Sequence, residues 1–309
     1  NMLKNSIPLG VSLLFVILFQ LFNNSTIESK QSGNKITNEA LQTIEVKGFL
    51  GEFNPFLSQE LLRDKVSINS DSSMIGSISI VNADQYRKWI GKINIANATS
   101  KDTIIDSSIL TFGTPNSTIS KARYIKLKAI RNGAYQSFMK GMERLAGFSG
   151  YDTLYLDLRN CSSGLDQEVT KIANQLVYDA DVMMMKEMFF NGTINKINSR
   201  GKVFFPLKKI IILVNEQTSG VSELLIRMIQ KGSQVEILGK PTVGAQLIMR
   251  FFPLSNGKYL FFPIGYYCND CEKVDQKYDQ KKLNPILPNI NLSDIKMDSL
   301  LKQKFDISL

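Results

Sequence analysis

The 309-residue sequence contains no histidine. Histidine is the usual base of Ser-His and Cys-His catalysis and the commonest zinc ligand, so its absence excludes those mechanisms and weakens any case for zinc. A hydrolase built on this sequence would need a Ser-Lys pair or a carboxylate. The sequence also lacks arginine-rich runs. Its net charge of +9 comes mostly from scattered lysines, which is typical of a solvated surface, and we expect no nucleic-acid partner.

Cysteine is scarce, with only Cys161, Cys268 and Cys271. A structural zinc site requires four ligands, and the single C-N-D-C pattern supplies two. This pattern therefore predicts either a short disulfide or two free thiols. We expect neither a metal nor another cofactor.

The N-terminal region contains an apolar run, residues 7–22, that follows Lys4. Sixteen residues span about 24 Å as a helix, which is short of the ~30 Å hydrocarbon core. This favours a cleavable signal peptide, with an uncleaved anchor or a buried helix as alternatives. We therefore predict an exported protein, periplasmic or extracellular, that contacts a membrane only through this segment.

The bulk composition, 43% hydrophobic and 21% charged residues, is ordinary for a globular protein with a sizeable core. From residue 122 onwards, strand-like and helix-like periodicity alternate, which predicts a mostly parallel sheet. Strands are expected at 122–129, 151–158, 209–214 and 235–238, and helices between them. Residues 74–81 and 83–90 predict a strand and a helix. Residues 247–252 and 259–264 predict a hairpin with Asn-Gly at its turn.

Two motifs carry the strongest functional signal. Residues 154–164 read LYLDLRNCSSG, and residues 215–249 read NEQTSGVSELLIRMIQKGSQVEILGKPTVGAQLIM. Together they resemble the core of the S41 serine peptidases, the C-terminal processing or tail-specific proteases. The resemblance places the family's nucleophile at Gly220 and its lysine base at Ala245, so the motif is present without either working side chain.

The same resemblance implies a crotonase/ClpP-like α/β fold with repeated ββα units and a mostly parallel sheet. Composition and pattern divide the rest of the chain into a signal peptide or anchor with its linker (1–30), a mixed N-terminal α/β region (31–120) and a C-terminal tail or short amphipathic helix (291–309), while the resemblance covers a peptidase-like domain (121–290). The resemblance also implies a substrate cleft lined by Ser163, Gly164, Val221 and Ser222. Ser163 replaces a family glycine near the oxyanion hole, and Met249 replaces a glutamine that orients the lysine.

These departures predict a pseudopeptidase that binds peptides or the C-termini of unfolded proteins. One alternative is an active serine peptidase in which Ser219 or Ser222 replaces the nucleophile and Lys240 replaces the base. A carboxylate mechanism would use Asp157, Asp166 or Glu168. A further alternative is a structural subunit that pairs with an active relative or with itself.

Overall fold

The computed structural model describes residues 79–90, 105–116, 121–146, 152–162, 164–201, 203, 205, 207–253, 257–272 and 284–306. The predicted signal segment, most of the region 31–120, and Ser163 lie outside these residues. Among the helices that are described, none is both long and apolar enough to cross a membrane.

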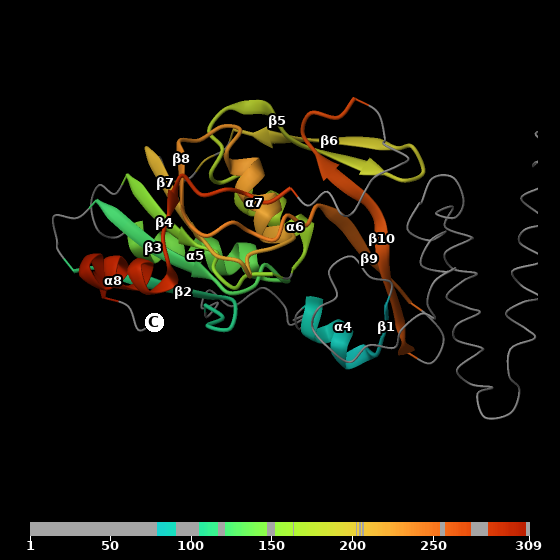
Figure 1. Cartoon of the computed structure of the whole chain (residues 1–309), viewed down its shortest axis with the longest axis horizontal. Helices are drawn as coiled ribbons and strands as arrows, with labels where there is room; N and C mark the ends of the chain where they lie inside the picture. The colour runs from blue at the N-terminus through green and yellow to red at the C-terminus, as the bar shows by residue number, and fades with distance from the viewer. Residues whose placement is uncertain are drawn as a thin grey trace, which may run out of the picture.

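The larger sheet has seven strands and is mostly parallel, as predicted (Figure 1). Its four central strands, at residues 122–127, 153–157, 209–214 and 235–239, all run in the same direction, while the strand at residues 110–115 joins the first of them in antiparallel register. The order across the sheet is β11 (Ile290–Asn291), β8 (Val235–Gly239), β7 (Lys209–Val214), β4 (Thr153–Asp157), β3 (Ala122–Leu127), β2 (Leu110–Pro115) and β12 (Phe305–Asp306).

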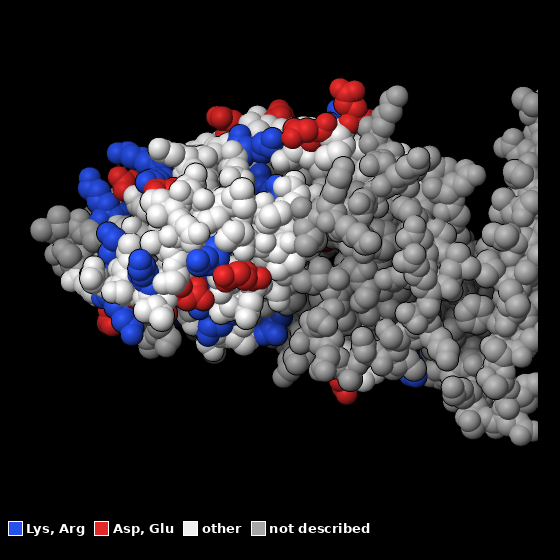
Figure 2. Space-filling view, viewed as in Figure 1, with Lys and Arg blue, Asp and Glu red and all other residues white. Residues whose placement is uncertain are grey.

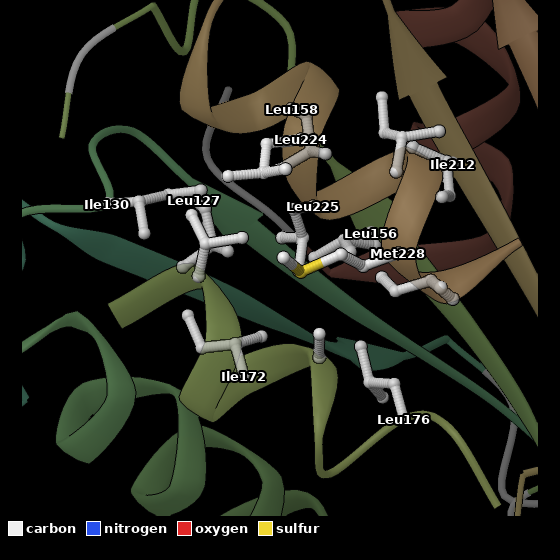
Figure 3. Packing of buried hydrophobic residues seen from close by; sticks show 14 of the residues in the cluster. Leu127, Ile130, Leu156, Leu158, Ile172, Leu176, Ile212, Leu224, Leu225 and Met228 are labelled. Carbon is white, nitrogen blue, oxygen red and sulfur yellow. The ribbon is translucent and has the colours of Figure 1, made fainter. Parts of the chain in front are cut away.

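Helices cover both faces of this sheet because successive strand residues point to opposite sides. On one face, Leu154 and Leu156 of β4 belong to the main core, which also contains residues of α5 (Ala134–Ala146), α6 (Asp166–Ala173) and α7 (Val221–Ile229). Figure 3 shows side chains of α6 and α7 converging on the sheet in this core. Tyr155 points to the other face and packs in a second cluster with residues of α8 (Asp294–Lys304).

The smaller sheet is antiparallel and curled (Figure 1). It contains the predicted hairpin, now β9 (Leu247–Pro253) and β10 (Tyr259–Cys268), which is confirmed by its register. β10 also pairs with β1 (Ser79–Val81) and with β5 (Ala180–Phe189), which in turn pairs with β6 (Ile194–Arg200). The helix expected at 83–90 is α4 (Ala83–Ile90). The β5–β6 hairpin was not expected from the sequence.

The segment predicted as a C-terminal tail is built into the larger sheet. β11 pairs with β8 at one edge, and β12 pairs with β2 at the other. Between them, α8 buries Met297 and Leu301, and Phe305 of β12 is buried beside them. The last residues described are therefore part of the domain. The region 31–120 also contributes strands to the domain. β1 pairs with β10 of the smaller sheet, and β2 pairs with β3 of the larger sheet.

The charged side chains are dispersed over the visible face of the molecule. Figure 2 shows Lys and Arg spread over this surface with Asp and Glu between them. This distribution agrees with the scatter of lysines along the sequence and is what a solvated surface requires.

Leu301→Ala tests whether α8 is part of the folded core. Leu301 is fully buried, so we expect the substitution to lower the free energy of unfolding by about 2–4 kcal/mol in urea titrations. Ile295→Ala, on the same helix at 82% exposure, is the control and should change it by less than about 0.5 kcal/mol. Equal effects of the two substitutions would show that α8 does not pack on the sheet.

Candidate functional site

Hydrogen bonds join the turns that carry the two sequence motifs. Asn215 accepts a bond from the backbone N–H of Asn160 at 3.1 Å and donates its side-chain amide to Asn160 Oδ1 at 2.8 Å. The hydroxyl of Thr218 donates to the carbonyl of Leu158 at 3.0 Å. The backbone N–H of Ser219 donates to the carbonyl of Cys161 at 3.2 Å. The end of β4 and the turn before α7 therefore form one unit.

The D-L-R-N sequence forms a buried ion pair beneath this unit. Asp157 is completely buried, and its carboxylate accepts bonds from the Arg159 backbone N–H at 3.0 Å and from Tyr124 Oη at 2.9 Å. Arg159 Nη2 lies 2.7 Å from Asp157, while its Nη1 bonds Asp298 of α8 at 2.7 Å. The pair holds the turn in place and leaves Asp157 in a structural role, without contact with the pocket described below.

Gly164 is required by a close backbone contact. A Cβ at this position would lie 2.3 Å from the carbonyl oxygen of Ile130, which is closer than any side chain tolerates. The absence of a side chain lets the turn after β4 run directly beside Ile130, and the N–H of Leu165 bonds that same carbonyl at 2.8 Å.

Gly220 precedes the first turn of α7 with φ of 58° and ψ of −116°. Residues with a Cβ rarely adopt this conformation, so a glycine relieves strain that any other residue would introduce. The space itself is open, because a Cβ added here would have the Ser162 carbonyl oxygen as its nearest neighbour, at 3.6 Å. A side chain at this position would therefore meet backbone strain but no steric clash.

Glu223 connects this turn to the loop that contains Ala245. Its Oε2 accepts bonds from the backbone N–H groups of Gly220 at 3.0 Å and Ala245 at 2.8 Å. Its Oε1 accepts the N–H of Gly244 at 2.6 Å and the hydroxyl of Thr242. Burial raises the pKa of Glu223, and the four donors oppose that shift by stabilising the carboxylate. One carboxylate therefore fixes the relative positions of residues 220 and 245.

A pocket of about 210 Å³ lies where the carboxyl ends of β4 and β7 meet the β9–β10 hairpin. Six of the residues singled out from the sequence line it together: Gly164, Asp166, Gly220, Val221, Ala245 and Met249. The full lining is Ser162, Gly164, Leu165, Asp166, Gln167, Gly220, Val221, Ala245, Leu247, Met249, Arg250, Phe251, Phe261 and Tyr267.

Several residues singled out from the sequence do not line this pocket. Ser222, expected in the cleft, is completely buried and donates its hydroxyl to the Cys161 carbonyl at 2.8 Å. Ser219 is 1% exposed, and its hydroxyl has no partner within the described part of the chain. Lys240 is also absent from the lining. Glu168 accepts the Tyr135 N–H at 2.8 Å and pairs with Lys171 at 2.7 Å.

A polar cluster on one wall of the pocket is not apparent from the sequence. Asp166 Oδ2 lies 2.6 Å from Arg250 Nη2 and accepts the hydroxyl of Tyr267 at 3.0 Å. Burial raises the pKa of Tyr267 well above its ordinary value. Arg250 and Tyr267 lie 84 and 101 positions after Asp166 in the sequence, so no short sequence motif could have linked the three residues. Of the three, sequence patterns single out Asp166 alone, as a candidate carboxylate.

The C-N-D-C pattern forms a disulfide between Cys268 and Cys271. The ammonium group of Lys186 donates to the Cys271 carbonyl at 2.8 Å and attaches this turn to β5. Cys161 is a free, buried thiol in the turn that follows β4, and burial raises its pKa to about 12. It is therefore a core residue and not a nucleophile.

The position of this pocket, outside the carboxyl ends of parallel strands, is the one at which α/β enzymes bind their substrates.

The family model of peptidase family S41 matches residues 121–289, just over half of the chain. The chain therefore belongs to peptidase family S41.

Relatives of known name are C-terminal processing enzymes. Carboxyl-terminal-processing peptidase 3 of Arabidopsis thaliana, a chloroplastic protein, is 24% identical over 257 residues, covering 82% of this chain and 48% of the relative. The carboxyl-terminal-processing protease of Synechocystis sp. is 27% identical over 166 residues, covering 54% of this chain and 36% of the relative. The chain thus spans half or less of the length of these relatives.

Solved structures show similarity in fold. A lipoprotein from Streptococcus agalactiae aligns with a TM-score of 0.52 at 16% identity, covering 98% of this chain and 100% of the other. The photosystem II D1 C-terminal processing protease aligns with a TM-score of 0.47 at 20% identity, covering 63% of this chain and 50% of the other.

Glu223→Gln tests the carboxylate that joins the two loops. An amide keeps the volume but faces N–H donors with its own NH₂ group, so we expect the free energy of unfolding to fall by about 2–4 kcal/mol. Chemical denaturation measures this loss. Glu143→Gln, at an exposed position of α5, should change it by less than about 0.5 kcal/mol. A loss no larger than that of the control would mean that the four bonds contribute nothing to stability.

Thiol alkylation tests the state of the three cysteines. The folded, unreduced protein should take up no iodoacetamide, because two cysteines are bonded to each other and Cys161 is buried. Unfolding without reductant should expose one thiol, and unfolding with reductant should expose all three, as measured by intact mass. Rapid modification of the folded protein would contradict this assignment.

Proposed function

We propose that this chain is a pseudopeptidase whose pocket binds peptides or protein C-termini without cleaving them. The observation that carries the proposal is the pairing of Gly220 and Ala245 around one carboxylate at the pocket. By resemblance these are the nucleophile and base positions of the family. The scaffold that aligns them is retained, while neither side chain can attack a carbonyl or accept a proton.

The remaining lining residues support this proposal. Two lining residues carry hydroxyl groups, Ser162 and Tyr267, and no lysine or histidine lies among the residues that line the pocket. A serine hydroxyl is a weak nucleophile without an adjacent base. Tyr267 is bonded to Asp166, and burial raises its pKa. The names of the relatives, which process carboxyl termini, support a polypeptide C-terminus as the ligand.

The competing function is an active serine peptidase with a relocated nucleophile. Ser162 is the residue that favours it, because it lines the pocket next to Gly220. Ser219 and Ser222 are weaker candidates, since both are buried away from the lining. Each relocated serine would still require a base that Lys240, outside the lining, is poorly placed to provide.

The disulfide supports export, which is part of the proposal. Disulfides persist in oxidising compartments and are rare in reducing ones. The Cys268–Cys271 bond agrees with the predicted signal segment at residues 7–22. Membrane attachment, where it occurs, would use that segment alone.

Proteolysis of an unfolded protein substrate separates these functions. We expect no cleavage by the full chain and clear cleavage after Gly220→Ser and Ala245→Lys are introduced together. Cleavage by the unmodified chain that is lost in Ser162→Ala would overturn the proposal in favour of a relocated serine. The matched control is Ser108→Ala, on an exposed turn, which should leave any activity unchanged.

Gly220→Ser alone should lower stability. At φ of 58° and ψ of −116° a Cβ adds about 1–3 kcal/mol of backbone strain, so the free energy of unfolding should fall by that amount. Gly220→Ala is the matched comparison and should show the same loss, because the strain belongs to the Cβ and not to the hydroxyl. An unchanged melting curve for both variants would indicate a relaxed turn.

A further inference from the structure

The walls of the pocket are mainly apolar. Val221 and Leu247 contribute aliphatic surface, and Phe251 stacks on Phe261 with ring centroids 4.2 Å apart. At about 210 Å³ the pocket is smaller than the roughly 300–1,000 Å³ of sites for drug-sized molecules. It therefore matches one apolar amino-acid side chain better than a larger ligand.

Arg250 is the one cationic residue among those that line the pocket. Its side chain is 37% exposed. Within the described residues its guanidinium donates two hydrogen bonds, to Asp166 Oδ2 at 2.6 Å and to the Met249 carbonyl at 3.0 Å. A guanidinium has five N–H donors, so three have no partner among the described residues, and the partly exposed side chain can offer donors to a ligand.

Asp166 can accept few further hydrogen bonds. Its Oδ2 already accepts bonds from Arg250 and Tyr267, and its Oδ1 accepts the Gln167 N–H at 2.9 Å. The spare hydrogen-bonding capacity of this wall is therefore that of a donor, and a ligand must bring acceptors. Because Asp166 and the Met249 carbonyl hold the guanidinium in one orientation, a ligand would not have to order it.

We propose that the pocket takes the last residue of a polypeptide, with an apolar side chain against the walls and the free α-carboxylate on Arg250. This inference rests on the proposed peptide-binding function and narrows it to a chain terminus. Guanidinium is the group best suited to carboxylates, since its fork matches two oxygens. Asp166 is then a positioning residue, which holds Arg250 through its Oδ2.

A pair of labelled peptides tests this directly. Each has about ten residues and ends in leucine, one with a free carboxylate and one with a C-terminal amide. Fluorescence anisotropy with the full chain should show the free acid binding about ten- to a hundredfold more tightly, the range expected for a charge-assisted bond. This comparison uses the unmodified protein and does not depend on how any variant folds.

Variants then assign the effect to Arg250. In Arg250→Gln the affinity for the free acid should fall to that for the amide. Arg250→Lys should recover only part of the preference, because an ammonium lacks the fork. Arg200→Gln, on the exposed strand β6 and outside the pocket lining, should leave both affinities unchanged.

The outcomes separate this inference from the function on which it rests. Equal affinities for the acid and the amide would overturn carboxylate recognition, while peptide binding itself would stand and point to an internal segment paired along a strand. A preference for the acid that survives in Arg250→Gln would also overturn the inference. Failure of both peptides to bind would reject it together with the proposed function.

Discussion

The structure of the site depends on a single buried carboxylate. Glu223 receives four donors from the turn at residue 220 and the loop at residues 242–245, which α7 and β8 separate in the sequence. A partly satisfied buried carboxylate is costly, so the loops are held in one arrangement or the site is lost. The arrangement is therefore maintained by folding stability itself. Burial and these four hydrogen bonds are enough to fix residues 220 and 245 relative to each other.

Much of the fold was predictable from local patterns. The continuous apolar run of β7 and the alternation in β3 predicted strands correctly, and the family resemblance predicted a mostly parallel sheet, which the structure confirms. The β5–β6 hairpin was missed because neither strand shows a two-residue alternation. In β5 the neighbours Met184 and Met185 are both buried, and β6 is mostly polar and exposed. The segment 291–309 was expected to be a short amphipathic helix or a tail. The structure has helix α8 there, and only the packing of Met297 and Leu301 shows that this helix belongs to the core.

The candidate site was predictable in part. Motif spacing pairs residues 220 and 245, and both line the pocket. Motif position alone put Ser222 in the cleft, whereas the first turn of α7 directs its hydroxyl to Cys161. Arg250 and Tyr267 were overlooked because they lie on the hairpin of the other sheet and meet Asp166 only through tertiary folding. Resemblance locates the motif positions that a family uses, but it does not show which residues elsewhere in the chain meet them after folding.

The short strands at the two edges of the larger sheet have a consequence for how the protein is made. β11 and β12 contribute two residues each, yet they cover the outer sides of β8 and β2. Before residues 290–306 emerge from the ribosome, those longer strands have exposed backbone edges that can pair with another chain. Folding of this segment therefore occupies part of each margin and removes backbone groups through which the nascent sheet could pair with another chain.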